Sequence, residues 1–257
     1  MRSFLLAAAA AILTAPACAQ PAATATAPVG APKLLIVISV DQLSADLFDE
    51  YRTQFSGGLA RIAGGTVFRN GFQSHATTET CLGHSTILTG DRPARTGIVG
   101  NLWFDPNTAR TDKAIYCAED ETVSGTSSAD YRVSPAHLRV PTLGDRLKQI
   151  SPASLNVAVA GKDRSAVMMG GRAVDQRWYW TGKRFETDVR DRPVPQAVGR
   201  TNAAVTAAIA APAAPLEPPA FCAGKAQSYP LPRGGKPVGD GRLARDAGRF
   251  GGFRPAP

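Results

Sequence analysis

The chain has 257 residues, of which 44% are hydrophobic and 7% aromatic, so it can form a packed core and is not a disordered protein. Its 29 basic and 21 acidic residues give a net charge of +8, which favours anionic partners. The basic residues are scattered, apart from four arginines near the end, and no aromatic-studded basic motif accompanies them. The composition therefore argues against a nucleic-acid-binding protein and leaves anionic lipids and phosphorylated molecules as partners.

The N-terminal segment is typical of an exported protein. Arg2 precedes a continuous apolar run from Phe4 to Leu13, which is too short to span a bilayer. Ala17-Cys18-Ala19 is a small-x-small cleavage site, so we expect a signal peptide over residues 1–19. Residues 20–32 are rich in Ala, Pro and Thr and indicate a flexible leader. Because no later segment is suited to cross a membrane, we predict export to a bacterial periplasm without stable membrane insertion.

Export permits disulfide bonds. Three cysteines follow the predicted cleavage site, Cys81, Cys117 and Cys222, and an odd number leaves at least one of them unpaired. For Cys81 we expect packing or a disulfide rather than a nucleophilic role, because no base is evidently set to activate its thiol. The sequence leaves the pairing open, and it contains no CxxC spacing of the kind that marks zinc sites.

The first part of the mature chain predicts a strand, helices and a second strand. Lys33 to Val40 is an unbroken β-branched run, which is typical of a strand buried on both faces of a parallel sheet. Helical pieces are expected over 43–55 and 57–63, ended by Gly64-Gly65. Residues 66–72 are expected to form another strand.

The rest of the chain continues this alternation. The apolar periodicity predicts, in chain order, a helix over 81–88, an amphipathic helix over 141–150, a buried strand over 155–160, a short helix over 165–169, a β-hairpin over 177–185 and an Ala-rich helix over 195–211. Strands followed by helices indicate an α/β fold with a doubly wound, mostly parallel sheet and flanking helices. Ligands of such sheets bind at the carboxyl ends of the strands.

The segment from Thr77 to Thr86 carries the most informative chemistry. Thr80 stands at the start of a predicted helix, where free backbone N–H groups and the helix dipole favour an anion. An alcohol that attacks phosphorus needs this setting, although a simple helix cap also explains a threonine here. Asp41 directly follows the first predicted strand, where a carboxylate can hold a metal ion or cap the next helix.

Three sequence blocks resemble the alkaline phosphatase superfamily. They are IVISVDQL, TTETCLGHSTILTGDRPARTGIVGN and AGKDRSAVMMGG, in this order between about Lys33 and Lys183. Within the superfamily they are most similar to periplasmic alkaline phosphatases with a threonine nucleophile, next to the nucleotide pyrophosphatase/phosphodiesterase branch. A sulfatase is a poor alternative, because the sequence lacks a C-x-P-x-R site for formylglycine.

The resemblance implies a role for five residues. Asp41 corresponds to a zinc ligand, and Thr80 to a nucleophile that also binds zinc and is transiently phosphorylated. Asn101 corresponds to a hydrogen-bond donor to one phosphoryl oxygen. Lys162 and Arg164 correspond to the pair that holds the other phosphoryl oxygens and marks the monoesterase branch. Without the resemblance, Asn101 is explained as a turn residue, and the two cations as surface charges.

Two further residues of the central block bear on this comparison. Leu82 replaces a proline that is frequent in the family, which changes the helix start without removing a reacting group. The resemblance implies a structural role for His84 rather than zinc binding. The function it implies is hydrolysis of phosphate monoesters through a phosphothreonine intermediate with two zinc ions. The alternatives are a phosphodiesterase or nucleotide pyrophosphatase, an inactive fragment, and a phosphate-binding pseudoenzyme.

The zinc-ligand set is incomplete in this sequence. Two zinc sites need about three histidines and three aspartates beyond the nucleophile. The chain has only three histidines, and none stands in a D-x-x-x-H or D-H pattern. Residues 212–257 hold nine prolines and eight glycines, which predicts a loop-rich end. We therefore expect residues 33–257 to be the N-terminal part of an alkaline phosphatase-like domain, incomplete at its C-terminus, in a longer enzyme.

Overall fold

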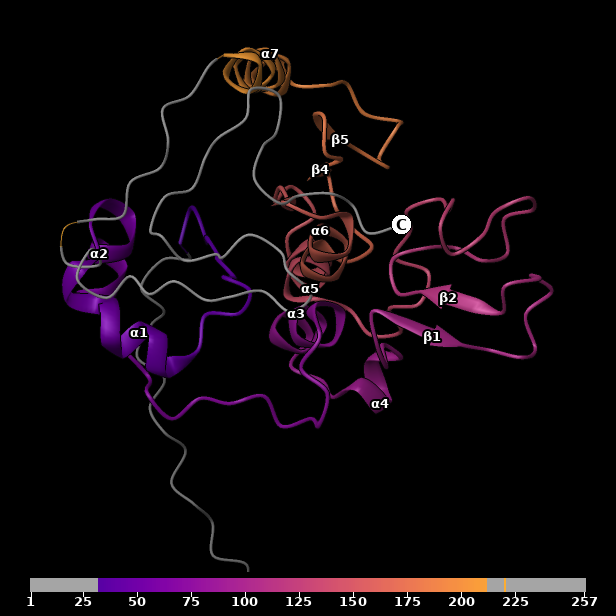
Figure 1. Ribbon diagram of the computed structural model, residues 1–257, viewed down its shortest axis with the longest axis horizontal. Coiled ribbons are helices and arrows are strands. Elements are labelled where there is room, and N and C mark those ends of the chain that lie inside the picture. The colour runs from indigo at the N-terminus through magenta and orange to yellow at the C-terminus, as the bar shows by residue number, and fades with distance from the viewer. Residues whose placement is uncertain (1–31, 212–219, 221–257) are drawn as a thin grey trace, which may run out of the picture. The chain divides into compact units, whose positions relative to one another are not determined.

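The computed structural model describes residues 32–211 and Ala220. The chain divides into two compact units, Met1–Val40 and Asp41–Pro257, and every described helix and strand belongs to the second unit (Figure 1). Four predicted features lie outside the described residues: the signal peptide over 1–19, nearly all of the leader over 20–32, Cys222, and the loop-rich stretch over 212–257 apart from Ala220.

Two of the predicted strands are not formed. Residues 33–40 have no strand partner within the described part of the chain, and Leu34 and Ile36 are exposed. Residues 66–72 form turns and irregular backbone instead, and the Phe68 side chain is exposed. Both predictions are wrong for the same reason: an apolar run becomes a strand only where a neighbouring strand accepts its backbone hydrogen bonds.

The predicted helical pieces near the start of the second unit are confirmed as α1 (Ala45–Tyr51), η1 (Arg52–Gln54) and α2 (Gly57–Ala63). Helix α1 begins after Ser44, whose side chain accepts a hydrogen bond from the Leu47 N–H at 3.2 Å. Helix α2 ends at Gly64, as predicted. Because Ser44 caps α1, the capping role considered for Asp41 is not needed.

A compact core forms around three helices, α3 (Thr80–Thr89), α4 (Pro93–Thr96) and α6 (Asp163–Gly170). Helix α3 packs against α6 and ends at Gly90, whose left-handed φ of 72° suits glycine. The buried residues of this core are Cys81, Leu82, Ile98, Tyr116, Cys117, Ala118, Leu138, Val167 and Met168. The predicted helices over 81–88 and 165–169 are confirmed, and their packing fixes the two helices that carry the sequence blocks.

The described strands form two small sheets. β1 (Leu102–Phe104) pairs antiparallel with β2 (Ala114–Tyr116), a pair that the sequence analysis did not predict. β3 (Val157–Ala160) pairs parallel with β4 (Gln176–Trp180), and β5 (Phe185–Glu186) pairs antiparallel with β4. The predicted strand over 155–160 and hairpin over 177–185 are confirmed, and β3, α6 and β4 form a parallel βαβ unit in an α/β fold.

Strand β3 is covered on one face only. Ala158 is buried against α6 and β4, whereas Val157 and Val159 are exposed. The predicted strand is therefore formed, but its predicted burial holds only for Ala158 within the described residues. The reason is that alternate residues of a strand point to opposite faces, and the face of Val157 and Val159 is uncovered there.

Two further helices complete the described part of the chain. α5 (Leu143–Ile150) begins with a capping box, in which Thr142 accepts from the Asp145 N–H and Asp145 accepts from the Thr142 N–H. α7 (Gln196–Ala210) confirms the predicted Ala-rich helix. None of the helices in the described residues is long and apolar enough to span a bilayer.

Candidate active site

The predicted nucleophile stands at the N-terminus of α3. Thr80 is the first residue of this helix, and its hydroxyl donates a 3.0 Å hydrogen bond to the Asp41 carboxylate. Gln42 follows Asp41 with a left-handed φ of 63°, so the chain turns sharply directly after the carboxylate. The structure thus brings together the two residues that the sequence analysis assigned to metal binding, although 39 positions separate them.

Asn101 is held against the same helix end from another direction. Its side-chain carbonyl accepts a 2.9 Å hydrogen bond from the Cys81 N–H, and its own backbone N–H donates to Glu79 Oε2 at 2.5 Å. Because the carbonyl of the Asn101 amide is used by the helix, its NH₂ group is the end that can donate to a ligand. This geometry fits the predicted role as a hydrogen-bond donor.

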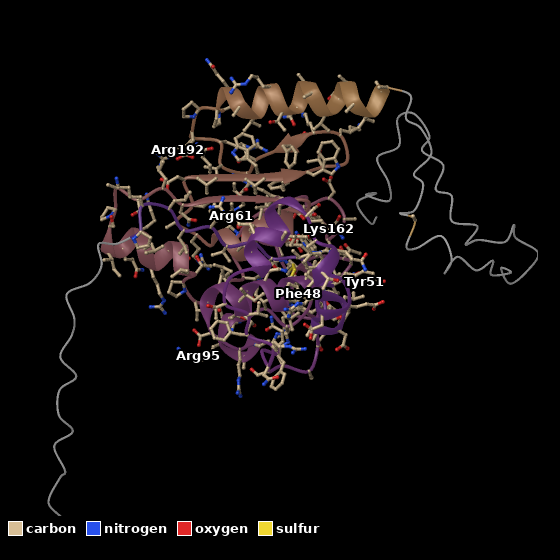
Figure 2. The ribbon with its side chains drawn as sticks, turned by 90° about the vertical axis from the view of Figure 1, so that its left-hand side faces the viewer. Phe48, Tyr51, Arg61, Arg95, Lys162 and Arg192 are labelled. Atoms are coloured by element: carbon tan, nitrogen blue, oxygen red, sulfur yellow. A yellow bond between two sulfur atoms is a disulfide. The ribbon has the colours of Figure 1, made fainter. Side chains whose placement is uncertain are left out.

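Lys162 and Arg164 lie at the N-terminus of α6, directly after strand β3 (Figure 2, where Lys162 is labelled). Lys162 is the residue that precedes the helix, and Arg164 is its second residue. Both side chains are partly exposed. They therefore stand at the carboxyl end of a parallel strand, which is where ligands of α/β sheets bind.

The N-termini of α3 and α6 lie at the same end of the core. Cys81 of α3 forms a disulfide with Cys117, and the two Cα atoms are 6.5 Å apart. Tyr116 donates a 2.8 Å hydrogen bond to Asp163, the first residue of α6. Because Tyr116 and Cys117 are neighbours, with Cα atoms about 3.8 Å apart, they hold both helix ends close together. The predicted nucleophile and the predicted cationic pair therefore share one side of the core.

The disulfide also shows that Cys81 is a structural cysteine and not a nucleophile. The sequence analysis left its pairing open between Cys117 and Cys222, and the structure pairs it with Cys117. Cys81 is fully buried, so it has neither a free thiol nor access to a substrate. The expectation of a structural cysteine is confirmed.

The three histidines do not complete a metal site. His84 is buried with its Nδ1 2.7 Å from the Thr80 carbonyl oxygen, which fits the structural role that the resemblance implies. His75 Nδ1 lies 2.5 Å from the Thr77 carbonyl oxygen. His137 packs edge-to-face on Trp103. Within the described residues, no three His, Cys, Asp or Glu side chains are grouped so that they could hold a metal ion.

Four residues near the site were missed by the sequence analysis. Glu79 anchors the backbone of Asn101, while Tyr116 and Tyr131 both donate to Asp163. Only Asp163 gave a local signal, since an acidic residue in the first turn of a helix is stabilised by the helix dipole. The tyrosines are 47 and 32 positions from their acceptor, so no local pattern could have linked them.

Comparisons of the sequence with known proteins show the family of the chain. Residues 35–223 match the model of the type I phosphodiesterase / nucleotide pyrophosphatase family. The chain is 52% identical to alkaline phosphatase PhoK of Sphingomonas sp. over 227 residues, covering 88% of this chain and 40% of PhoK. It is 42% identical to alkaline phosphatase PhoD of Zymomonas mobilis, covering 91% of this chain and 40% of PhoD. The chain thus spans about two fifths of the length of these relatives.

The fold is also similar to a solved alkaline phosphatase. The match to the crystal structure of alkaline phosphatase PafA has a TM-score of 0.57 at 28% identity, and it covers 69% of this chain and 36% of PafA. A second match, with a TM-score of 0.58, is a PafA variant in which a threonine, an asparagine, a lysine and an arginine are replaced. Because the family model matches residues 35–223, most of the chain, the chain belongs to the type I phosphodiesterase / nucleotide pyrophosphatase family.

Proposed function

We propose that this protein, in its full length, hydrolyses phosphate monoesters with Thr80 as the nucleophile. The observation that carries the proposal is the Thr80 hydroxyl at the N-terminus of α3, hydrogen-bonded at 3.0 Å to Asp41. The positive end of the α3 helix dipole favours an anionic substrate at that position. The names of PhoK and PhoD support a phosphatase, and the proposal concerns the longer protein because the chain spans 40% of each.

The proposed reaction has two displacements at phosphorus. In the first, Thr80 Oγ1 forms a bond to phosphorus while the bond to the substrate's alcohol oxygen breaks, and the alcohol leaves with a proton. In the second, water attacks the phosphothreonine, and inorganic phosphate and the Thr80 hydroxyl are released. Asp41 accepts the hydrogen bond of that hydroxyl, so it orients the oxygen before attack.

Three side chains are proposed to hold the phosphoryl group. A loose transition state spreads charge over the three equatorial oxygens, which need donors in fixed positions. Arg164 offers a planar fork and Lys162 a point charge, while the Asn101 amide donates a neutral hydrogen bond. Asn101 contacts the N-terminus of α3, and Lys162 and Arg164 lie at the N-terminus of α6, which supports this assignment.

Zinc is the metal that we propose for the complete site. Asp41 and Thr80 present two oxygen donors 3.0 Å apart at a partly exposed point, which fits one side of a metal centre. Bound zinc would lower the pKa of an attacking hydroxyl and stabilise the charge of a leaving oxygen. These two side chains cannot complete two zinc sites, and the other ligands are proposed to come from the rest of the full-length protein.

Diester hydrolysis is the second candidate, because the matching family model is named for phosphodiesterases. A monoester brings a dianionic phosphoryl group, whereas a diester has one negative charge and a second organic substituent. Two cations directed at phosphoryl oxygens favour the dianion. The pair of Lys162 and Arg164 therefore favours the monoester, and a phosphate-binding protein without turnover is the third candidate.

The test is made on the full-length protein with zinc, and it compares p-nitrophenyl phosphate with a diester of the same leaving group. Replacement Thr80→Ala is expected to lower monoester turnover by on the order of 10³-fold or more, because the attacking oxygen is gone. Thr80→Ser restores an attacking oxygen and serves as the matched control. Lys162→Ala is expected to lower the monoester rate more than the diester rate.

The location of the protein is tested by applying the same assay to cell fractions. We propose export to the periplasm on the basis of residues 1–19, so activity should appear in the periplasmic rather than the cytoplasmic fraction.

Undiminished turnover in Thr80→Ala would overturn the proposed function. Equal monoester and diester losses in Lys162→Ala would overturn the monoester preference, and phosphate binding without turnover would favour the third candidate.

A further inference from the structure

One carboxylate lies between the two proposed phosphate-binding cations. Asp163 follows Lys162 and precedes Arg164 in the chain, and it is the first residue of α6. Tyr116 donates to its Oδ1 at 2.8 Å, and Tyr131 donates to its Oδ2 at 2.6 Å. Each carboxylate oxygen therefore has its own tyrosine, and the orientation of the group is fixed from two sides.

The two tyrosines are themselves firmly held. Tyr116 is buried, its backbone N–H donates to the buried Glu119 at 2.7 Å, and its ring lies 4.5 Å from that of Tyr131. The next residue, Cys117, is tied by its disulfide to Cys81, which follows Thr80. A short path of covalent bonds and one hydrogen bond therefore joins the nucleophile to Asp163.

We propose that Asp163 is a positioning residue that, through Tyr116 and Tyr131, sets the Lys162 and Arg164 side chains relative to Thr80 and thereby selects phosphate monoesters. This inference rests on the proposed function, since it assigns a task to the same site. Asp163 need not touch the substrate. It acts by fixing the first turn of α6, to which Lys162 and Arg164 are directly attached.

The electrostatics of the tyrosines support this arrangement. Burial raises the pKa of Tyr116 above its ordinary value, and the negative charge of Asp163 raises it further, while Arg164 acts in the opposite direction. Burial likewise raises the pKa of Tyr131, again with a contribution from Asp163. Both hydroxyls therefore keep their protons at alkaline pH and remain donors to the carboxylate.

A plainer explanation is that Asp163 only stabilises the helix. An acidic residue in the first turn interacts favourably with the helix dipole, by about 0.3–1 kcal/mol at the surface. That role requires no tyrosine, and it predicts that losses on substitution are the same for every substrate. The positioning role predicts instead that removing either hydroxyl harms monoesters selectively.

The experiment uses the full-length protein and three variants, Asp163→Asn, Tyr116→Phe and Tyr131→Phe. Each is expected to lower kcat/KM for p-nitrophenyl phosphate by about 10- to 100-fold, the usual effect of removing a group that orients active-site ligands. The diester rate is expected to change less than about threefold, since a diester depends less on the two cations. Tyr179→Phe is the matched control, because this buried tyrosine has no described hydrogen bond to Asp163.

A double substitution, Lys162→Ala with Arg164→Ala, provides the second measurement. In that background Asp163→Asn should lower the monoester rate no further, because the side chains that it positions are gone. An additional loss there, equal losses on both substrates, or no loss in any variant would overturn the positioning role. If the wild-type protein has no turnover, or keeps it in Thr80→Ala, the proposed function has failed instead.

Discussion

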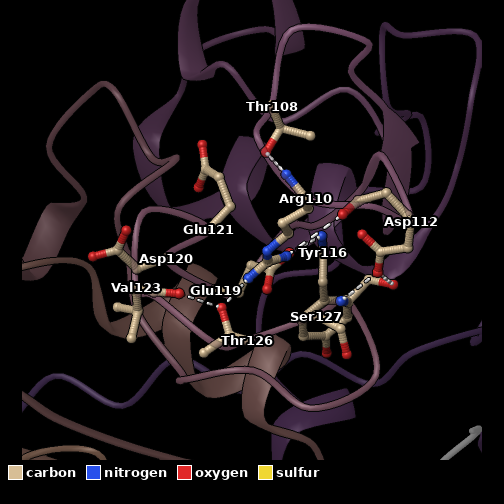
Figure 3. Close-up of polar contacts among 12 residues, drawn as sticks. Thr108, Arg110, Asp112, Tyr116, Glu119, Asp120, Glu121, Val123, Thr126 and Ser127 are labelled. Carbon is tan, nitrogen blue, oxygen red and sulfur yellow. Dashed lines mark hydrogen bonds and ion pairs between the residues drawn. The ribbon is translucent and has the colours of Figure 1, made fainter.

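At the scale of single residues, Arg110 and Glu119 form a buried ion pair whose two charges depend on each other. Figure 3 shows the Arg110 side chain extending between Glu119 and Thr126, to which it donates at 2.6 Å each. Glu119 is fully buried and also accepts from the Tyr116 N–H at 2.7 Å. A charge in this position needs its partner, because an unpaired buried carboxylate is costly. The pair therefore stabilises the segment that holds Tyr116.

Replacing the cation should be strongly destabilising. Arg110→Met keeps an apolar stem but leaves the Glu119 carboxylate without its cationic partner, so we expect the free energy of unfolding at neutral pH to fall by about 3–5 kcal/mol. Arg95→Met is the control, since the Arg95 side chain is exposed and its ion pair with Asp91 is expected to contribute less than about 1 kcal/mol. Urea denaturation measures both. A loss in Arg110→Met no larger than in the control would contradict this account.

At the scale of elements, the junction between α5 and α6 depends on one glycine. Gly171 follows α6 with a φ of 76° and a ψ of −155°, a backbone region that only glycine occupies readily. A Cβ at this position would collide with Thr142 and Asp145, the two residues of the α5 capping box. The end of one helix therefore packs directly on the cap of another, which leaves no room for a side chain.

Two glycine substitutions should have opposite effects on stability. Gly171→Ala combines backbone strain with overpacking, so we expect it to lower the free energy of unfolding by about 2–4 kcal/mol. Gly199→Ala, inside α7 and with open space at its Cβ position, should instead raise it by up to about 1 kcal/mol. Thermal unfolding followed by circular dichroism compares the two variants. A neutral Gly171→Ala would show that the junction is looser than described.

At the scale of the whole molecule, the described residues leave apolar surface uncovered. Strand β3 is an edge strand, and Val157 and Val159 in it are exposed, as is Leu155 just before it. Exposed edges with apolar side chains favour association between chains. The described residues likewise contain no group of three His, Cys, Asp or Glu side chains that could hold a metal ion, and Asp41 and Thr80 are the two ligands proposed among them. Stability and activity should therefore both be deficient in the 257-residue chain by itself.

The 257-residue chain alone is expected to self-associate and to lack turnover. With zinc present, it should hydrolyse p-nitrophenyl phosphate no faster than its Thr80→Ala variant, because the ligand set is incomplete. Val159→Lys should reduce self-association in sedimentation, since a charge on an edge strand opposes pairing. Ile150→Lys, at an even more exposed apolar position at the end of α5, is the control. Zinc-dependent turnover that Thr80→Ala abolishes would contradict the prediction.

The helices and strands that were predicted correctly are those whose sequence patterns lie within the element itself. Helices α5, α6 and α7, strand β3 and the β4–β5 hairpin follow from periodicity, caps and turn residues that lie within the elements themselves. The strands expected over 33–40 and 66–72 failed, and the β1–β2 pair was missed. A strand is defined by a partner elsewhere in the chain, and three-residue strands such as β1 are too short for a periodic pattern.

The sequence by itself determined the family, the α/β fold and the candidate residues Asp41, Thr80, Asn101, Lys162 and Arg164, because motif order and residue chemistry are written along the chain. Only the tertiary structure decided which cysteines pair and which side chains form hydrogen bonds around the candidate site. The Cys81–Cys117 disulfide and the bonds from Tyr116 and Tyr131 to Asp163 span 36, 47 and 32 positions. Contacts over such distances follow from how helices and strands pack, and no local pattern encodes them.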